Sequence, residues 1–210
     1  MGDTGEARRP LKTRSAAWAQ RLAAALARSN VTPNQISVAS LVFALAGAAL
    51  LAWYVSPWGL VATAAMIQGR LLCNLLDGMV AMEGGRRSAA GEIYNDLPDR
   101  LSDAVILLAA GYSVAWPGFA HELGWSAALL AVMTAYVRTL GCSSGLPQDF
   151  RGPMAKPQRM FVMTVACLAA CFDTRAIAPA LGIIALGSLV TGAARLRRIV
   201  QLLERRSSHD

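Results

Sequence analysis

Two stretches near the middle of the chain place polar side chains at helical spacing within otherwise apolar sequence. In each stretch the positions recur every three or four residues, so they share one face of a helix. They are Arg70, Asn74, Asp77 and Ala81 in the first stretch, and Gly91, Asn95, Asp99 and Asp103 in the second. Carboxylate and amide oxygens that converge from adjacent helices are the ligands that a hard divalent cation prefers. The spacing therefore predicts a site for a divalent metal ion, with Asp77, Asn74, Asn95 and Asp99 as its ligands.

The elements that must carry these residues are membrane helices. The chain has 210 residues, of which 55% are hydrophobic and 16% are charged, and this composition is unusually apolar for a soluble domain. The hydrophobic residues gather in blocks near the length of about 20 that a helix needs to cross the hydrocarbon core. We expect an all-α integral membrane protein with six transmembrane helices, at residues 35–55, 58–82, 91–114, 123–140, 157–172 and 177–197.

The formal net charge of +7 comes from basic residues that lie almost entirely on one side of these blocks. They precede the first block and follow the second, fourth and sixth, whereas the intervening loops carry only Arg175. This distribution is the positive-inside pattern, which accounts for the charge without a nucleic-acid partner. We therefore expect a multi-pass protein of the cell inner (cytoplasmic) membrane, with both termini and the polar site facing the cytoplasm.

The N-terminal part differs in character from the rest of the chain. Residues 1–14 are polar, and we expect them to be disordered. Trp18, Leu22 and Leu26 then fall on one helical face, apart from the neighbouring arginines, which predicts an amphipathic helix lying on the inner leaflet. Because no internal repeat is visible, residues 15–206 are interpreted as a single membrane domain.

The segment from Asn74 to Asp99 reads NLLDGMVAMEGGRRSAAGEIYNDLPD and resembles the signature of the CDP-alcohol phosphotransferase family. That signature is DxxDGxxAR, an eight-residue spacer, and then GxxxDxxxD. The positions that match in identity and spacing are Asp77, Gly78, Ala81, Gly91 and Asp99. The resemblance implies a membrane enzyme of phospholipid biosynthesis. Such an enzyme transfers a phosphatidyl group from a CDP-alcohol, such as CDP-diacylglycerol, to a polar acceptor alcohol and releases CMP.

The chain departs from the signature at three positions. Asn74 and Asn95 stand where the first and third aspartates belong, and Met82 stands where the family has arginine, so the resemblance is to a divergent bacterial branch. The asparagines remove two negative charges but retain a side-chain oxygen. We expect one firmly held Mg²⁺ or Mn²⁺, and a second that is weak or arrives with the substrate diphosphate. Both asparagines also suit interhelical hydrogen bonds.

The resemblance further implies where the nucleotide binds. Gly78, Ala81 and Gly91 lack bulk, so a cytidine nucleotide can lie against the helix backbones between the two polar stripes. Arg86 and Arg87, in the loop between the stripes, are candidates to replace the missing arginine as phosphate contacts.

For the reaction itself, the family pattern implies that Asp99 is the general base, which takes the proton of the acceptor hydroxyl. Family members that use a phosphorylated alcohol bind its phosphate through basic residues. Arg138, Lys156 and Arg159 are the corresponding candidates here. These three residues equally suit positive-inside anchors.

Other interpretations remain open for parts of the sequence. A catalytically silent membrane scaffold is motivated by Asn74 and Asn95, and a small transporter by the polar stripes, although the absence of a repeat in the sequence counts against a transporter. Asp96 and Asp103 are expected to be helix caps or salt-bridge partners. A homodimer is expected only by analogy with the family.

Overall fold

The computed structural model describes residues 16–29, 31–83 and 90–207, and these ranges contain helices and no strands. The elements are α1 (Ala17–Arg28), α2 (Pro33–Trp53), α3 (Pro57–Glu83), α4 (Gly91–Tyr112), α5 (Ala120–Ser143), α6 (Lys156–Ala170), the 3₁₀ helix η2 (Thr174–Ala176) and α7 (Ile177–Ser207). The all-α class is confirmed, and each predicted span coincides with one of the helices α2 to α7. The expected disordered segment 1–14, together with Arg86 and Arg87, lies outside the described residues.

Four of the described helices are long and apolar enough to cross a membrane. The four segments are Pro33–Trp53, Pro57–Met82, Ala120–Ser143 and Thr174–Arg206. The two other predicted spans are helical but depart from this pattern, because α6 has only 15 residues and α4 carries several charged side chains. The chain is therefore a helical membrane protein in which α4 and α6 are the atypical helices.

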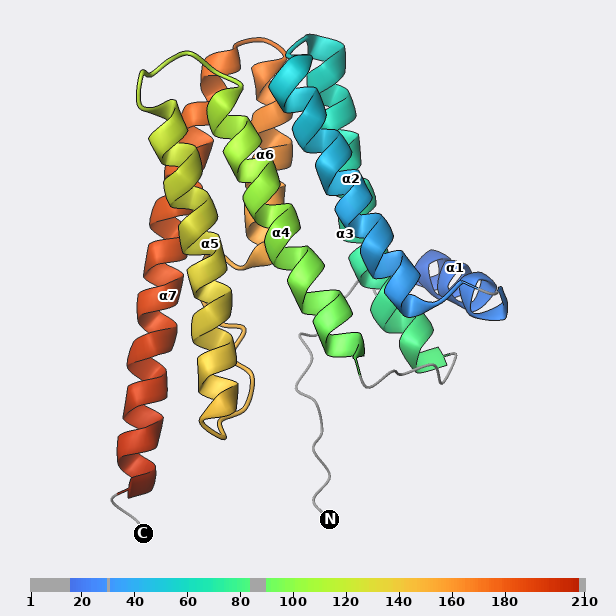
Figure 1. The fold of residues 1–210 in the computed structure, drawn as a ribbon, viewed down its shortest axis with the longest axis vertical. Coiled ribbons are helices and arrows are strands. Elements are labelled where there is room, and N and C mark those ends of the chain that lie inside the picture. Colours follow the sequence, from blue (N-terminus) through green and yellow to red (C-terminus); the bar gives the residue numbers. More distant parts are fainter. Residues whose placement is uncertain (1–15, 30, 84–89, 208–210) are drawn as a thin grey trace.

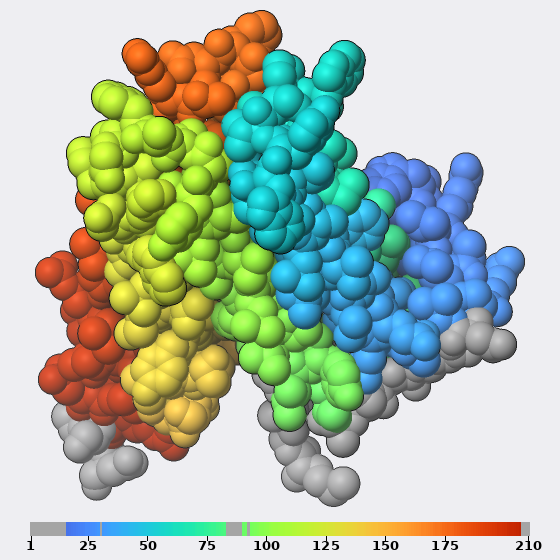
Figure 2. Space-filling model, turned by 45° about the horizontal axis from the view of Figure 1, so that its top comes forward, coloured from blue at the N-terminus to red at the C-terminus, as the bar shows by residue number. Residues whose placement is uncertain are grey.

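Helices α2 to α7 stand side by side with their long axes roughly aligned, and α4 lies between α2 and α5 (Figures 1 and 2). Small residues allow α4 and α5 to approach closely. A Cβ atom on Gly111 would come within 2.9 Å of the Gly124 Cα, and one on Gly124 within 3.0 Å of the Gly111 Cα. Any side chain at this crossing would force the two helices apart, as in other small-residue contacts between membrane helices.

Helix α1 runs crosswise to the bundle beside α3 (Figure 1). It packs through small side chains, since Ala19 and Ala23 are fully buried in a cluster that includes Leu76 and Val80 of α3. The larger Trp18 remains 51% exposed. A helix is therefore present at the predicted position, and its protein contact is made by alanines rather than by its largest apolar side chain. Its place on the inner leaflet stays a prediction.

The first residues of α2 set the position of that helix against α3. The Thr32 Oγ1 accepts a hydrogen bond of 3.2 Å from the Gln35 backbone N–H, and the Gln35 side chain accepts one of 2.9 Å from the Thr32 N–H. Pro33 occupies the first turn, where a missing N–H costs nothing. This capping box starts α2 so that Ser37, one turn later, faces α3.

Candidate active site

Asp77 lies in the last two turns of α3 and is buried, with 4% of its surface exposed. Its Oδ2 accepts a hydrogen bond of 2.7 Å from the Ser37 hydroxyl of α2, and its Oδ1 accepts one from the Gly78 backbone N–H. Ser37 was not predicted from the sequence, because a serine within an apolar span becomes informative only when its partner helix is known.

Asp99 lies in the third turn of α4 and is 8% exposed. Its Oδ2 forms an ion pair with the ammonium of Lys156, the first residue of α6. Its Oδ1 is buried and has no hydrogen-bond partner within the described ranges, although the Arg70 guanidinium lies 3.7 Å away. One oxygen of this carboxylate is therefore neutralised, and the other is available for a ligand or a proton.

Asp103, one turn beyond Asp99, is enclosed by two arginines. Its Oδ1 lies 2.7 Å from Arg70 Nη2, and its Oδ2 accepts hydrogen bonds of 2.8 and 3.1 Å from Arg159. Arg159 also donates to the Thr134 hydroxyl and the Met154 carbonyl. Of the two interpretations of Asp103, the salt-bridge partner is the one observed. A buried pair of this kind is costly to break and holds α3, α4 and α6 in register.

Asp96 is held on the outer side of the same helix. Arg138 Nη2 of α5 donates to both carboxylate oxygens, at 3.1 and 2.9 Å, and Arg100 Nη2 donates to Oδ2 at 2.8 Å. The Arg138 guanidinium also lies over the Phe150 ring, 5.4 Å from its centre. Asp96 is therefore also a salt-bridge partner rather than a helix cap.

The chain is similar in sequence to proteins of known function. No family model matches it. The archaetidylinositol phosphate synthase of Aeropyrum pernix is 34% identical over 143 residues, which make up 67% of this chain and 69% of that protein. The chain belongs to the CDP-alcohol phosphotransferase family. The phosphatidylinositol phosphate synthase of Mycobacterium marinum is 28% identical over 184 residues, or 83% of this chain and 76% of that protein.

Solved structures of the same family show the same fold. The phosphatidylinositol phosphate synthase of Mycobacterium tuberculosis with CDP-DAG bound superimposes with a TM-score of 0.73 at 21% identity, covering 88% of this chain and 94% of that one. The structure of that synthase in complex with manganese and citrate has a TM-score of 0.72 and covers 86% and 88% of the two chains.

Two of the predicted metal-ligand residues, Asn74 and Asp99, carry buried side-chain atoms that lack hydrogen-bond partners among the residues that the structure describes. In the described part of the chain, Asp99 Oδ1 and Asn74 Nδ2 are buried atoms without hydrogen-bond partners. Because the amide nitrogen and oxygen exchange places by a half-turn, Asn74 can present its oxygen at the same point. Asn95 is exposed. No three His, Cys, Asp or Glu side chains among the described residues are grouped to hold a metal, and the binding of a divalent cation stays a prediction.

Among the small residues of the family signature, Gly78 and Ala81 lie in the last two turns of α3, and Gly91 is the first residue of α4. Gly78, Ala81 and Gly91 are each partly exposed, so the backbone at these positions is accessible to a ligand. Arg86 and Arg87 belong to the segment outside the described ranges, and their assignment stays a prediction.

The three predicted acceptor-binding residues each contact a different aspartate of α4. Lys156 pairs with Asp99, as described above, while Arg159 pairs with Asp103 and Arg138 pairs with Asp96. They therefore do not form one isolated cationic group. They form a row of ion pairs along α4, in which Arg159 is buried and Lys156 and Arg138 are partly exposed.

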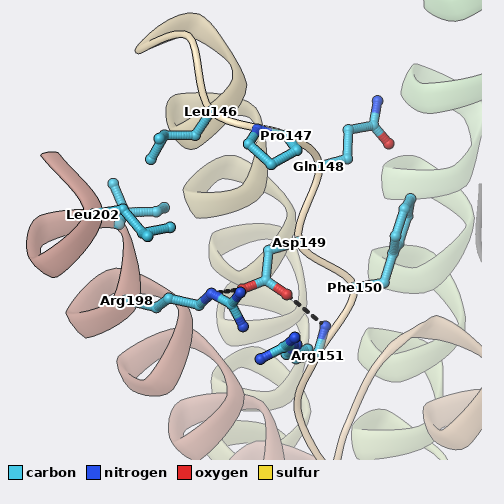
Figure 3. A pocket seen from close by; sticks show the side chains of 9 residues that line it. Leu146, Pro147, Gln148, Asp149, Phe150, Arg151, Arg198 and Leu202 are labelled. Carbon is cyan, nitrogen blue, oxygen red and sulfur yellow. Dashed lines mark hydrogen bonds and ion pairs between the residues drawn. The ribbon is translucent and has the colours of Figure 1, made fainter. Parts of the chain in front are cut away.

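A pocket of about 300 Å³ lies away from these carboxylates, between the α5–α6 loop and α7 (Figure 3). Asp149 lies in its wall, where it accepts a hydrogen bond of 2.9 Å from the Arg151 N–H and lies 3.7 Å from Arg198 Nε. The Arg151 carbonyl in turn accepts a hydrogen bond of 2.8 Å from Arg195 Nε of α7. These contacts fix the loop that leads into α6 and thereby position Lys156.

Proposed function

We propose that this family member transfers the phosphatidyl group of CDP-diacylglycerol to a polar alcohol and releases CMP. The observation that carries the proposal is the pair of buried carboxylates at the family's second and fourth acidic positions, Asp77 on α3 and Asp99 on α4. The 34% identity to an archaetidylinositol phosphate synthase supports the same reaction class.

The cofactor in this proposal is Mg²⁺ or Mn²⁺, held by Asp77, Asn74 and Asp99, with Asn95 at the exposed edge. When bound, the cation supplies positive charge that stabilises the diphosphate as the phosphorus–oxygen bond to CMP breaks. The manganese in the structure of the Mycobacterium tuberculosis synthase supports this type of ion.

The nucleotide would lie across Gly78, Ala81 and Gly91, where the helix backbones are accessible. Arg86 and Arg87, which follow α3, would contact its phosphates and compensate for Met82, whose side chain is exposed at the family's arginine position. A guanidinium binds phosphate oxygens through two parallel N–H donors.

The chemical step uses Asp99 as the general base. Its Oδ2 is held by Lys156, so Oδ1 is the atom that accepts the proton of the acceptor hydroxyl. The deprotonated oxygen forms a bond to the phosphorus next to the lipid, and the bond from that phosphorus to the CMP oxygen breaks. The proton remains on Asp99 until solvent removes it, and no covalent enzyme intermediate is required.

The acceptor in this proposal is a phosphorylated polyol of the inositol phosphate class. Two relatives are named archaetidylinositol phosphate synthase and phosphatidylinositol phosphate synthase. In this chain Arg138, Lys156 and Arg159 pair with Asp96, Asp99 and Asp103 of α4. Lys156 and Arg138 are the members of this set with surface left for a phosphate, and Arg159 supports them through Asp103.

We further propose that all six helices α2 to α7 span the inner membrane, with the termini and the site on the cytoplasmic side. The charges of α4 pair with α3, α5 and α6, while Ile93, Leu97 and Leu101 of α4 are exposed. On α6, Phe161 and Val165 are exposed in the same way. A helix whose apolar side chains are exposed and whose charged side chains pair with neighbouring helices is typical of a membrane bundle, where its outer face contacts lipid. In this arrangement residues 15–206 form one membrane domain, α1 lies on the inner leaflet, and a homodimer follows by family analogy.

The test is a CMP-release assay on purified protein. Labelled CDP-diacylglycerol and Mg²⁺ or Mn²⁺ are supplied with inositol phosphate, glycerol phosphate, inositol or serine as acceptor. We expect acceptor-dependent CMP release that is greatest with inositol phosphate and that stops when a chelator is added. Chelator-insensitive release would contradict the proposed role of the metal.

A catalytically silent scaffold is the second candidate, and the asparagines at positions 74 and 95 favour it. The absence of CMP release with every acceptor, together with a lack of Mn²⁺ binding, would support this candidate. The assay therefore separates the two functions without any variant.

A further inference from the structure

We propose that the Lys156 ammonium occupies the position of a second cation at Asp99, so that this chain works with a single divalent metal ion. The inference rests on the proposed function and deepens it, because it assigns a role to a residue of the same site. Lys156 contacts Asp99 Oδ2 directly. An ammonium group at this point supplies positive charge to one oxygen of the Asp99 carboxylate.

The residue type supports this role. Of the 20 basic residues in the chain, 18 are arginine and two are lysine, Lys12 and Lys156. Lys156 is thus the one lysine within the ranges that the structure describes. An ammonium is a compact point charge with three rotatable donors, whereas a guanidinium is a planar fork. Only the ammonium resembles a metal ion in size and in the way it approaches a single carboxylate oxygen.

The charges around the site point to the same conclusion. On α4, Asp96 is paired with Arg100 and Arg138, and Asp103 is paired with Arg70 and Arg159. Asp99 Oδ2 is paired with Lys156.

Asp77 differs from these three aspartates, because its carboxylate accepts hydrogen bonds from Ser37 and Gly78 and forms no ion pair with a described residue. Since Asn74 and Asn95 are uncharged, Asp77 is the carboxylate left to balance the charge of one divalent cation. The described aspartates of the site leave no further negative charge to balance a second divalent cation.

An ammonium at Asp99 is compatible with the acceptor-binding role proposed for Lys156. One of its three N–H donors is used by Asp99, and the other two remain for a phosphate oxygen. The same group would therefore neutralise the general base and face the incoming acceptor.

The experiment counts bound Mn²⁺ on the full chain in nanodiscs of zwitterionic lipid, by electron paramagnetic resonance of the free ion, with and without CDP. Three proteins are compared with wild type. The first carries Asn74→Asp and Asn95→Asp, the second adds Lys156→Met, and the third adds Arg100→Met instead. Arg100 is the matched control, since its removal deletes one positive charge from Asp96 and leaves Asp99 untouched.

We expect one Mn²⁺ per chain in wild type, in the double variant and in the Arg100→Met control, whether or not CDP is present. The variant that adds Lys156→Met should bind two, because a nearby unit positive charge has been removed. Thermal unfolding verifies folding, and Lys156→Gln replaces Lys156→Met if the latter does not fold.

Two bound ions in wild type or in the double variant would overturn the inference, as would one ion after Lys156 is replaced, or none in any protein. CMP release is measured in parallel on wild type. If wild type binds one Mn²⁺ but releases no CMP, the proposed function is contradicted and the role of Lys156 is not. If wild type releases CMP but binds two Mn²⁺, the role of Lys156 is contradicted and the proposed function is not.

Discussion

Arg70 Nη2 of α3 donates a hydrogen bond of 3.2 Å to the backbone carbonyl of Asp99 on α4. The same nitrogen lies 2.7 Å from the Asp103 carboxylate, and the Arg70 residue is completely buried. One side chain therefore ties the backbone of the proposed general base to the helix that carries Asp77. The sequence analysis placed Arg70 on the polar stripe of its helix but gave it no partner.

Replacing Arg70 with methionine should destabilise the protein. The change leaves the buried Asp103 with one arginine instead of two, and breaking a buried ion pair costs about 3–5 kcal/mol. We expect a markedly lower melting temperature of the purified protein, measured by fluorescence-detected size exclusion after heating. The matched change Arg100→Met acts on the more exposed Asp96 and should lower the melting temperature less. Equal melting temperatures for the two variants would show that Arg70 does not hold α3 and α4 together.

Replacing either Asp77 or Asp99 with asparagine should reduce CMP release by at least about a hundredfold while the fold is retained, because the metal ligand or the general base is lost. The control is Asp173→Asn, which removes an exposed carboxylate at the start of η2 rather than one from the site. Its rate should stay within about twofold of wild type. Near-normal release by Asp77→Asn or Asp99→Asn would exclude the proposed mechanism.

Ser37→Ala should weaken metal binding without unfolding the protein. The Ser37 hydroxyl orients the Asp77 carboxylate at 2.7 Å, and loss of such an outer contact lowers metal affinity by about 10–100-fold. The measurement is the Mn²⁺ concentration that gives half-maximal CMP release. Ser40→Ala is the control, since that equally buried hydroxyl donates only to the Ser37 carbonyl of its own helix. A similar shift in both variants would attribute the effect to α2 packing.

The proposed orientation can be checked with single cysteines in a variant that lacks the four native ones. Glu122 at the start of α5 and Glu204 near the end of α7 are both exposed. In intact cells, Glu122→Cys should react with an impermeant thiol reagent, and Glu204→Cys should react only after the inner membrane is opened. The reverse labelling pattern would place the site on the outer side.

The course of the helices could be predicted from the sequence because block length and periodicity are local properties. The blocks at 35–55 and 58–82 became α2 and α3, and the polar stripes that hold Asp77 and Asp99 were visible from their spacing alone. The matching signature positions also identified the family that the relatives then confirmed. These features depend on residues within a few turns of one another.

The partners of those residues were decided only by tertiary structure. Ser37 and Asp77 are 40 residues apart, and Arg159 and Asp103 are 56 apart, so their contacts depend on which helices pack together and at what height. Spacing along one helix specifies the face on which a side chain lies, but not the side chain it meets. For that reason the sequence alone indicated a metal site between two helices, whereas the pairing of Lys156 with Asp99 emerged only when α6 was packed against α3 and α4.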